Sequence, residues 1–289
     1  MIRSNLDSTA ISAHSPNVWQ YVNPLHLLRN LWHNRDLIRQ FTRREVEGRY
    51  KGSFLGLFWS FVTPLVMLLI YTFVFGVVFK SKWPSAKTGS LSEFAVTLFC
   101  GLIVFNIFSE SVGRAAALIT SVPNYVKKVV FPLEILPISG LGAALFHGGV
   151  SLCILLVANL LVSGALQWTL LVLPLVLLPL LFLTLGLTWF LASLGVFVRD
   201  IGYTVTLVVQ MLFFLTPIFY AIENIPEPYR AIIGLNPLTP IVEDFRRVVL
   251  WGSLPAWGEL ALLIVGSGAA MILGYAWFMK TKKAFADVL

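Results

Sequence analysis

The densest group of chemically active side chains is a basic run of six residues, Arg35, Arg39, Arg43, Arg44, Arg49 and Lys51. Guanidinium and ammonium groups bind phosphates and carboxylates through charge-assisted hydrogen bonds. Leu37, Ile38, Phe41 and Val46 lie between these cations at spacings that put much of their apolar surface on one side of a helix. Two interpretations are open: a helix on a membrane surface that faces anionic headgroups or a protein partner, and an ordinary solvated helix beside the membrane.

Other reactive patterns are absent from the sequence. It contains no GxxxxGK(S/T) phosphate loop, HExxH helix, GxSxG elbow or Cys/His ligand cluster, so we predict neither catalytic residues nor a metal site. Cys100 and Cys153 lie in apolar runs and are predicted to act as small hydrophobic residues. Glu110 is the only acidic residue within a predicted span, near its end, and His147 is predicted to be a hydrogen-bonded packing residue. A pore or carrier driven from outside the chain fits better than an enzyme.

The composition is that of a polytopic membrane protein. Of the 289 residues, 57% are hydrophobic and 12% are charged, whereas soluble domains contain about 25% charged residues. The net charge of +7 is therefore interpreted as a sign of topology, and no nucleic-acid partner is predicted. Apolar runs predict six transmembrane helices in a hydrocarbon core of about 30 Å: Leu57–Phe79, Phe94–Val112, Ile135–Val162, Leu170–Val198, Tyr203–Tyr220 and Leu260–Met279.

Three regions follow from this reading. Residues 1–22 are polar and mixed, and are predicted to form a cytosolic tail. Residues 23–56 are predicted to form amphipathic interface helices and a turn, with a helix starting at Asn23-Pro24. Residues 57–289 are the six-span membrane domain.

The basic residues orient the six spans. With both termini in the cytoplasm, 15 of the 21 basic residues lie inside and 6 lie outside, as the positive-inside rule requires. Lys80, Lys82 and Lys87 follow the first span and run against this trend. We therefore predict a multi-pass protein with cytoplasmic termini.

Two loops differ from simple connections. The inner loop 113–134 carries Lys127-Lys128 between Pro123 and Pro132, which is typical of either a positive-inside anchor or a contact site for a cytosolic partner. The outer segment 221–259 has two short amphipathic pieces broken by prolines. That pattern predicts a re-entrant helical hairpin, and a folded surface loop is the alternative.

Three stretches together resemble a known family: GRYKGSFLGLFWSFVTPL (48–65), NYVKKVVFPLEILP (124–137) and FLTPIFYAIENIPEPYRAIIGLNPLTPIVEDFRRVVLWG (214–252). They are similar to the membrane subunits of ABC-2 type polysaccharide exporters, which move O-antigen, capsular polysaccharide or teichoic acid. The resemblance covers about residues 30–285. It implies an all-α fold with six spans, an N-terminal amphipathic interface helix and a re-entrant periplasmic helix pair. It also implies a homodimer in the bacterial inner membrane that exports a lipid-linked polysaccharide. Two separate nucleotide-binding subunits would bind ATP and Mg, and this chain would bind no cofactor.

The resemblance further implies roles for individual residues. Coupling to the ATPase is assigned to Arg35, Arg39, Arg43, Arg44, Tyr125, Lys127 and Lys128. The cytosolic channel mouth is assigned to Arg49, Tyr50, Lys51, Gly52, Leu55 and Gly56. The periplasmic gate is assigned to Pro226, Tyr229, Asn236, Pro237, Pro240 and Arg246.

Aromatic residues of spans one and five are candidates for the channel lining: Phe58, Trp59, Tyr71, Phe213, Phe214 and Tyr220. Aromatic rings can stack on the C–H faces of sugars, while Tyr and Trp can hydrogen bond to hydroxyls. The same residues would equally suit a lipid-facing surface or an interface anchor. Two other functions remain open: an ABC-2 permease for a drug or small lipid, and a membrane glycosyltransferase, against which the scattered acidic residues argue.

Overall fold

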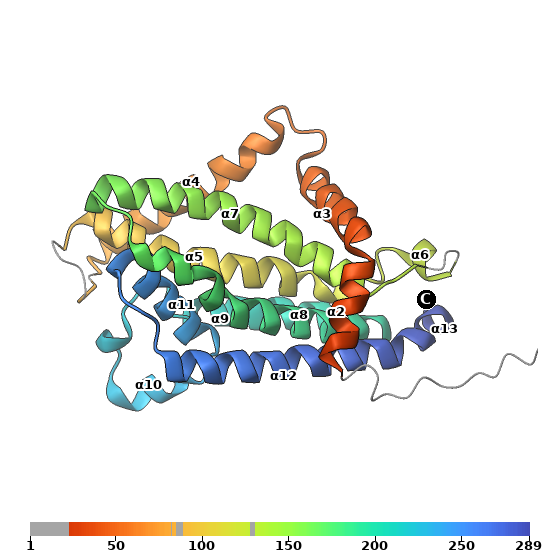
Figure 1. Ribbon diagram of the computed structural model, residues 1–289. Helices are drawn as coiled ribbons and strands as arrows, with labels where there is room; N and C mark the ends of the chain where they lie inside the picture. The colour runs from red at the N-terminus through yellow and green to blue at the C-terminus, as the bar shows by residue number, and fades with distance from the viewer. Residues whose placement is uncertain (1–22, 82, 85–88, 128–130) are drawn as a thin grey trace, which may run out of the picture.

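The computed structural model describes residues 23–81, 83–84, 89–127 and 131–289, and every regular element in these ranges is a helix. Five helical stretches are long and apolar enough to cross a membrane: Gly56–Val78, Leu91–Ala117, Ile135–Ser163, Trp168–Phe197 and Trp257–Val288. They confirm the expectation of a helical membrane protein. The long helices run side by side along the body of the molecule (Figure 1).

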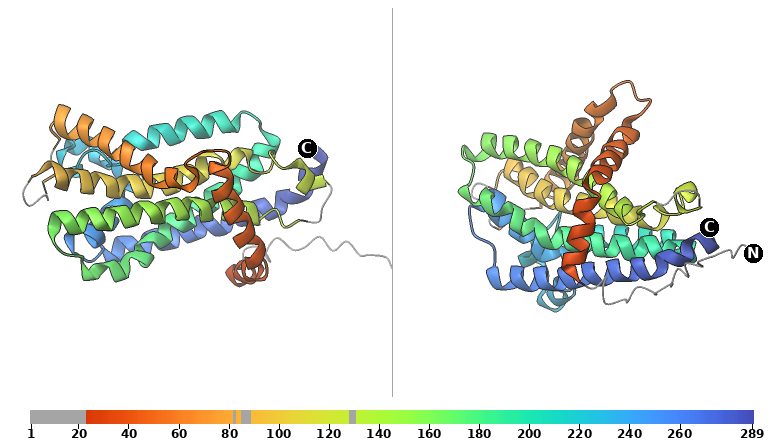
Figure 2. Two further views of the ribbon diagram at one scale, coloured as in Figure 1. Left: turned by 90° about the horizontal axis from the view of Figure 1, so that it is seen from above. Right: turned by 45° about the vertical axis from the view of Figure 1, so that its right-hand side comes forward.

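Two helices precede the first span. Helix α2 (Pro24–His33) starts where expected, since the Asn23 side chain accepts a hydrogen bond from the Leu25 amide at 2.9 Å. Helix α3 (Arg35–Tyr50) follows directly. Figure 1 and the right-hand view of Figure 2 show α2 steeply across the long axis of α12 (Trp257–Thr281).

The first span departs from the body of the molecule. It consists of the short turn η1 (Gly56–Phe58), helix α4 (Trp59–Tyr71) and the π-helical stretch η2 (Thr72–Val78). Helices α3 and α4 form an inverted V whose apex is the connecting turn (Figure 1). None of the most apolar part of this span is buried within the chain, so its outer surface needs a cover of lipid or protein.

Helix α5 (Leu91–Gly113) lies at the centre of the protein. About 72% of the residues in its most apolar part are buried. It packs against α7 (Ile135–Ser163), α8 (Leu173–Phe197), α9 (Ile201–Leu215) and α11 (Leu238–Arg246). This central position makes α5 the element against which the other parts of the site are held.

Small residues allow two close helix contacts. A Cβ atom added to Gly274 of α12 would clash with the carbonyl oxygen of Gly186 on α8, and one added to Gly148 of α7 would lie 2.7 Å from Ile107 on α5. By contrast, Gly140 and Gly266 have open space around the position of a Cβ. Gly274 therefore allows the backbones of α12 and α8 to approach closely, and Gly148 makes room for the Ile107 side chain.

The fifth apolar run forms a shorter helix than the expected span Tyr203–Tyr220. Helix α9 has 15 residues, ends at Leu215 and continues into a non-helical segment. Pro217 explains the end, because proline disfavours helical backbone in the residue before it and has no N–H of its own. At 1.5 Å per residue, α9 alone is shorter than a hydrocarbon core of about 30 Å.

The remaining elements are short and gather at the two ends of the long helices (Figure 1). At one end lie η5 (Ile222–Asn224), α10 (Glu227–Gly234), α11 and the π-helical η6 (Arg247–Trp251). At the other end lie η3 (Ala115–Ala117), α6 (Pro123–Lys127), η7 (Lys282–Ala284) and α13 (Phe285–Val288). The turn η4 (Trp168–Val172) begins the fourth long stretch.

A cluster of hydrogen bonds around Glu134, the Glu134 cluster, joins three distant segments at the end of the molecule where α6 lies. The Glu134 carboxylate, almost fully buried, accepts hydrogen bonds from Asn30 of α2 at 3.1 Å and from Lys282 at 2.6 Å. Asn30 also donates to the Tyr275 hydroxyl at 3.1 Å, and the Trp189 indole donates to the Glu134 carbonyl at 3.0 Å. Around the Glu134 cluster, apolar side chains of α2, α8, α12 and α13 form a second hydrophobic core, separate from the core around α5.

Candidate functional site

A sharp turn connects the interface helix to the first span. Gly52 and Gly56 have φ angles of +86° and +49°, a left-handed conformation that favours glycine. They bracket the turn that follows Lys51, the C-cap residue of α3. The Trp59 indole closes it by donating to the Ser53 hydroxyl at 2.9 Å. The sequence motif around Gly52 therefore reverses the chain and brings Arg49 and Tyr50 above the body of the molecule.

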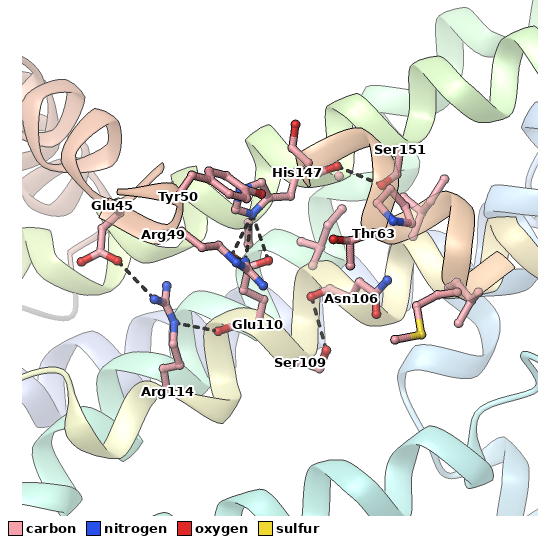
Figure 3. A pocket seen from close by; sticks show the side chains of 18 of the residues that line it. Glu45, Arg49, Tyr50, Thr63, Asn106, Ser109, Glu110, Arg114, His147 and Ser151 are labelled. Atoms are coloured by element: carbon pink, nitrogen blue, oxygen red, sulfur yellow. Dashed lines mark hydrogen bonds and ion pairs between the residues drawn. The ribbon is translucent and has the colours of Figure 1, made fainter. Parts of the chain in front are cut away.

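Three ionisable side chains from three helices meet at this position (Figure 3). Arg49 of α3 forms an ion pair of 2.6 Å with Glu110 of α5, and His147 Nδ1 of α7 lies 3.0 Å from the same carboxylate oxygen. The side chains of Glu110 and His147 are about 15% and 14% exposed, while Arg49 is 51% exposed. We call these residues the Arg49–Glu110–His147 cluster.

Tyr50 of α3 packs against the Arg49–Glu110–His147 cluster. Its ring lies edge-on to His147, with ring centroids 5.8 Å apart. Burial of the ring raises the pKa of Tyr50, Arg49 opposes this shift, and Glu110 adds to it. The phenol therefore remains neutral at physiological pH and can donate or accept a hydrogen bond.

Close packing of α3 on α7 holds Arg49 in place. Gly142 of α7 leaves room for Thr42 of α3, since a Cβ at position 142 would lie 2.7 Å from the threonine hydroxyl. Arg114, the C-cap residue of α5, also pairs with Glu45 of α3 at 3.2 Å. The interface helix is thus attached to both helices that supply Glu110 and His147.

The Arg49–Glu110–His147 cluster lines part of a cleft of about 1390 Å³ between α3, α4, α5 and α7. Polar side chains of the middle cleft include Thr63, Asn106 and Ser151 (Figure 3). Tyr71 and Phe213 line its more apolar part. The cleft therefore combines charged groups with an apolar and aromatic surface, which can receive an amphiphilic molecule.

The structure places two of the six predicted channel-lining residues in the wall of the cleft and the other four outside it. Tyr71 and Phe213 line the cleft, whereas Phe58, Trp59, Phe214 and Tyr220 are not part of its wall. Phe214 is 64% exposed on the outer side of α9. Tyr71 and Phe213 also contact the buried Phe219, at centroid distances of 5.3 and 5.0 Å. The two aromatic side chains that line the cleft are consequently held in place by packing against Phe219.

Of the six residues predicted to form the channel mouth, three line the cleft and three do not. Arg49, Tyr50 and Lys51 line the cleft, and so do Arg43 and Arg44 of the ATPase-coupling group. Gly52, Leu55 and Gly56 form the turn above it and do not contribute to its wall.

Two stretches assigned to ATPase coupling come together. Arg44 of α3 donates to the Tyr125 hydroxyl of α6 at 2.9 Å. Phe41 packs against Tyr125 and Phe131, with centroids 5.8 and 5.0 Å away. Arg35, Arg39, Arg43 and Arg44 are exposed, whereas Lys128 lies outside the described residues. Helix α3 and the described part of the loop 113–134 thus adjoin each other through basic and aromatic side chains.

Arg246, which the resemblance assigned to the periplasmic gate, is completely buried. It is 0% exposed, and its guanidinium donates to the carbonyls of Thr97 and Ile218 and to the Glu243 carboxylate, at 3.1, 3.2 and 2.7 Å. The guanidinium also lies 4.4 Å from the centre of the Trp83 ring. Burial lowers the pKa of Arg246, and Glu243 counteracts this effect. Arg246 therefore ties α11 to α5.

The other residues assigned to the periplasmic gate lie in or directly beside the two short helices α10 and α11. Pro226 and Pro237 directly precede α10 and α11, and Pro240 lies in the first turn of α11. The Asn236 amide donates to the Thr216 hydroxyl at 2.9 Å, while Tyr229 is 60% exposed. A pair of short helices is thus present in this segment.

Sequence reasoning missed the pairing of Glu110 with Arg49 and His147. The signals were present separately: one carboxylate in an apolar span, one histidine in the next, and a basic helix end. Ionisable groups inside a membrane seek partners, but the residues are far apart in sequence and α3 lies outside the spans. Asn106, an amide within the apolar run Phe94–Val112, was a further sequence signal of a polar cleft.

Comparison with known proteins places this architecture in a family. The family model for the ABC-2 type transporter matches residues 36–250. The chain belongs to the ABC-2 type transporter family. This ABC-2 protein is 30% identical over 265 residues to the O-antigen export system permease protein RfbA of Myxococcus xanthus, a match that covers 91% of this chain and 99% of the relative.

Other relatives of the ABC-2 protein carry similar names. An O-antigen export system permease protein RfbA of Klebsiella pneumoniae is 29% identical over 270 residues, covering 92% of this chain and 99% of the relative. The polysialic acid transport protein KpsM of Escherichia coli is 24% identical over 253 residues, covering 83% and 92%. The resemblance found in the three sequence stretches is confirmed.

Proposed function

We propose that this chain is the permease subunit of an ATP-driven exporter that carries a lipid-linked polysaccharide across the bacterial inner membrane. Its similarity to two O-antigen export permeases, along about nine-tenths of its length, carries this proposal. The cleft agrees with such a cargo, because it places cations beside an apolar and aromatic surface.

The cluster and Lys51 would receive the anionic end of the cargo. A lipid-linked glycan carries phosphate between lipid and sugar, and arginine binds phosphate through paired N–H donors. Arg49 is half exposed, so it can reach a ligand in the cleft while it is held by Glu110. A phosphate would compete with the Glu110 carboxylate for the Arg49 guanidinium. The sugars would then contact Asn106, Tyr71 and Phe213.

A second copy of this chain would complete the passage. The first span has no buried residue in its most apolar part, and it forms one wall of the cleft. Leu69 and Phe73 on this span are 70% and 59% exposed. Two copies placed with these spans facing the shared axis would cover part of this surface and enclose the polymer.

Energy would come from two copies of a nucleotide-binding partner that binds ATP and Mg. The sequence has no phosphate loop of its own. The partner would bind the surface formed by α3 and α6, including Arg39, Arg43, Arg44 and Lys127. In this orientation both termini are cytoplasmic and α10 and α11 close the periplasmic end. The non-helical segment after α9 would then complete a sixth crossing.

The proposal is tested by deleting the gene in a strain without another exporter of the same glycan. The deletion strain should lose the surface polysaccharide and accumulate the lipid-linked form in the cytoplasm, and a plasmid-borne copy should restore export. Normal surface glycan with altered tolerance of small lipophilic compounds would instead identify a permease for a drug or small lipid.

A further inference from the structure

Helix α2 presents an apolar surface that the rest of the described chain leaves uncovered. Leu27 is buried at 3% exposure against the second core. Leu25, Leu28 and Trp32 are 71%, 61% and 72% exposed. Their spacing of three and four residues puts them on one face of the helix. A stripe of this kind, on a helix that lies across the spans (Figure 1), suits the boundary between acyl chains and headgroups.

Basic side chains lie directly beside this stripe, at the elbow where α2 meets α3. A cavity of about 410 Å³ there is lined by Arg29, Asn30, Trp32, His33 and Arg35. The Arg35 guanidinium donates to the Trp32 carbonyl at 3.2 Å and stands 5.4 Å from the centre of its ring. These contacts hold Arg35 over the cavity.

The charges of the elbow are not neutralised by nearby acids. Among the described residues, no carboxylate lies within ion-pairing distance of Arg29 or Arg35. Asp36 follows Arg35 in the sequence but does not line the cavity. Asn30 is engaged with Glu134 and Tyr275 on the opposite side. The cavity therefore has a net positive lining, with two arginines that form no ion pair among the described residues.

We propose that the α2–α3 elbow binds the headgroup of an anionic phospholipid from the surrounding membrane. The lipid phosphate would accept hydrogen bonds from Arg29 and Arg35, whose planar donors match its oxygens. Trp32 would sit at the headgroup level, where tryptophan is enriched in membrane proteins. Leu25 and Leu28 would contact the start of the acyl chains. This apolar neighbourhood favours a lipid over an ATPase surface, and the site is separate from the transport cleft.

The test uses the purified complex of the permease with its ATPase, in a mild neutral detergent. Phosphatidylglycerol or phosphatidylcholine is titrated in, and the number of bound lipids per complex is read by native mass spectrometry. The double variant Arg29→Gln/Arg35→Gln removes the two donors. The matched control Lys280→Gln/Lys283→Gln removes two exposed charges at the same end of the molecule.

Wild type and control should bind phosphatidylglycerol more tightly than phosphatidylcholine, and the double variant should lose about fivefold in phosphatidylglycerol affinity per arginine. Excess inorganic phosphate should not displace the lipid. Unchanged phosphatidylglycerol binding in the double variant would overturn the proposal, and so would loss of the ATPase with lipid binding intact. Displacement by inorganic phosphate alone would point to a free anion site. If the double variant fails to assemble, Arg29→Gln alone gives the same comparison at about fivefold.

Discussion

Replacing Glu110 with glutamine tests the competition proposed for the mouth of the cleft. The variant keeps the size of the side chain and one carbonyl oxygen but removes the charge that holds Arg49 at 2.6 Å. Hydrogen bonds to charged groups contribute about 1.5–3 kcal/mol and neutral ones about 0.5–1.5 kcal/mol. Because Arg49 is 51% exposed, solvent screening reduces its share of the difference.

For the half-exposed Arg49, the difference falls to about 0.5–1 kcal/mol after this reduction. This energy no longer opposes a phosphate that competes for Arg49. Since 1.4 kcal/mol corresponds to a factor of ten in binding, substrate affinity should rise by about two- to fivefold. Glu110→Gln should therefore lower the melting temperature of the complex slightly and improve its apparent affinity for lipid-linked glycan.

The assay is ATP hydrolysis by the reconstituted complex at increasing concentrations of lipid-linked glycan. Half-maximal stimulation should occur at a lower concentration for Glu110→Gln than for wild type. Glu45→Gln is the matched control, because its pair with Arg114 is 3.2 Å long and more exposed, and it should leave the curve unchanged. An equal or higher half-maximal concentration for Glu110→Gln would refute the idea that Glu110 competes with the substrate phosphate.

Two further predictions concern stability. Arg246→Met should destabilise the protein by about 3–5 kcal/mol, because removing one partner leaves Glu243 unpaired beside a buried site; thermal unfolding of the purified protein should show this, and an unchanged melting temperature would contradict the role of Arg246 as a tie between α11 and α5. Gly274→Ala should cost about 1–3 kcal/mol through overpacking against α8, whereas Gly266→Ala, which has open space around it, should not change the melting temperature. Equal effects of the two alanines would show that the close α8–α12 contact is unimportant.

Local features of the fold were predictable from sequence because the bilayer restricts the choice of structure. An apolar run in lipid must satisfy its own backbone hydrogen bonds, so long runs become helices. The capped start of α2 at Asn23 and the turn around Gly52 follow from short-range chemistry in the same way. The early end of α9 was also encoded, by Pro217, but continuous hydrophobicity from Tyr203 to Tyr220 concealed it.

Long-range partners were not predictable from these patterns. Arg246 lies in a segment whose charges suggest a solvated interface, yet its donors are used by carbonyls from α5 and from the segment after α9. Likewise, His147 was expected to be a packing residue, and its hydrogen bond to Glu110 depends on the register between α5 and α7. Such contacts depend on tertiary packing, which hydrophobic periodicity does not specify.

The Glu134 cluster has a mechanical consequence. Its hydrogen bonds join α2 and the start of η7, directly after α12, to a single carboxylate at the start of α7. A push delivered to α3 by a bound ATPase would pass through α2 to this point and move the bases of two long helices at once. Helix α4 follows α3 after the glycine turn and packs against α7 and α5. Movement of α3 and of the start of α7 would therefore change the angle between these helices and α4, and so widen or narrow the cleft.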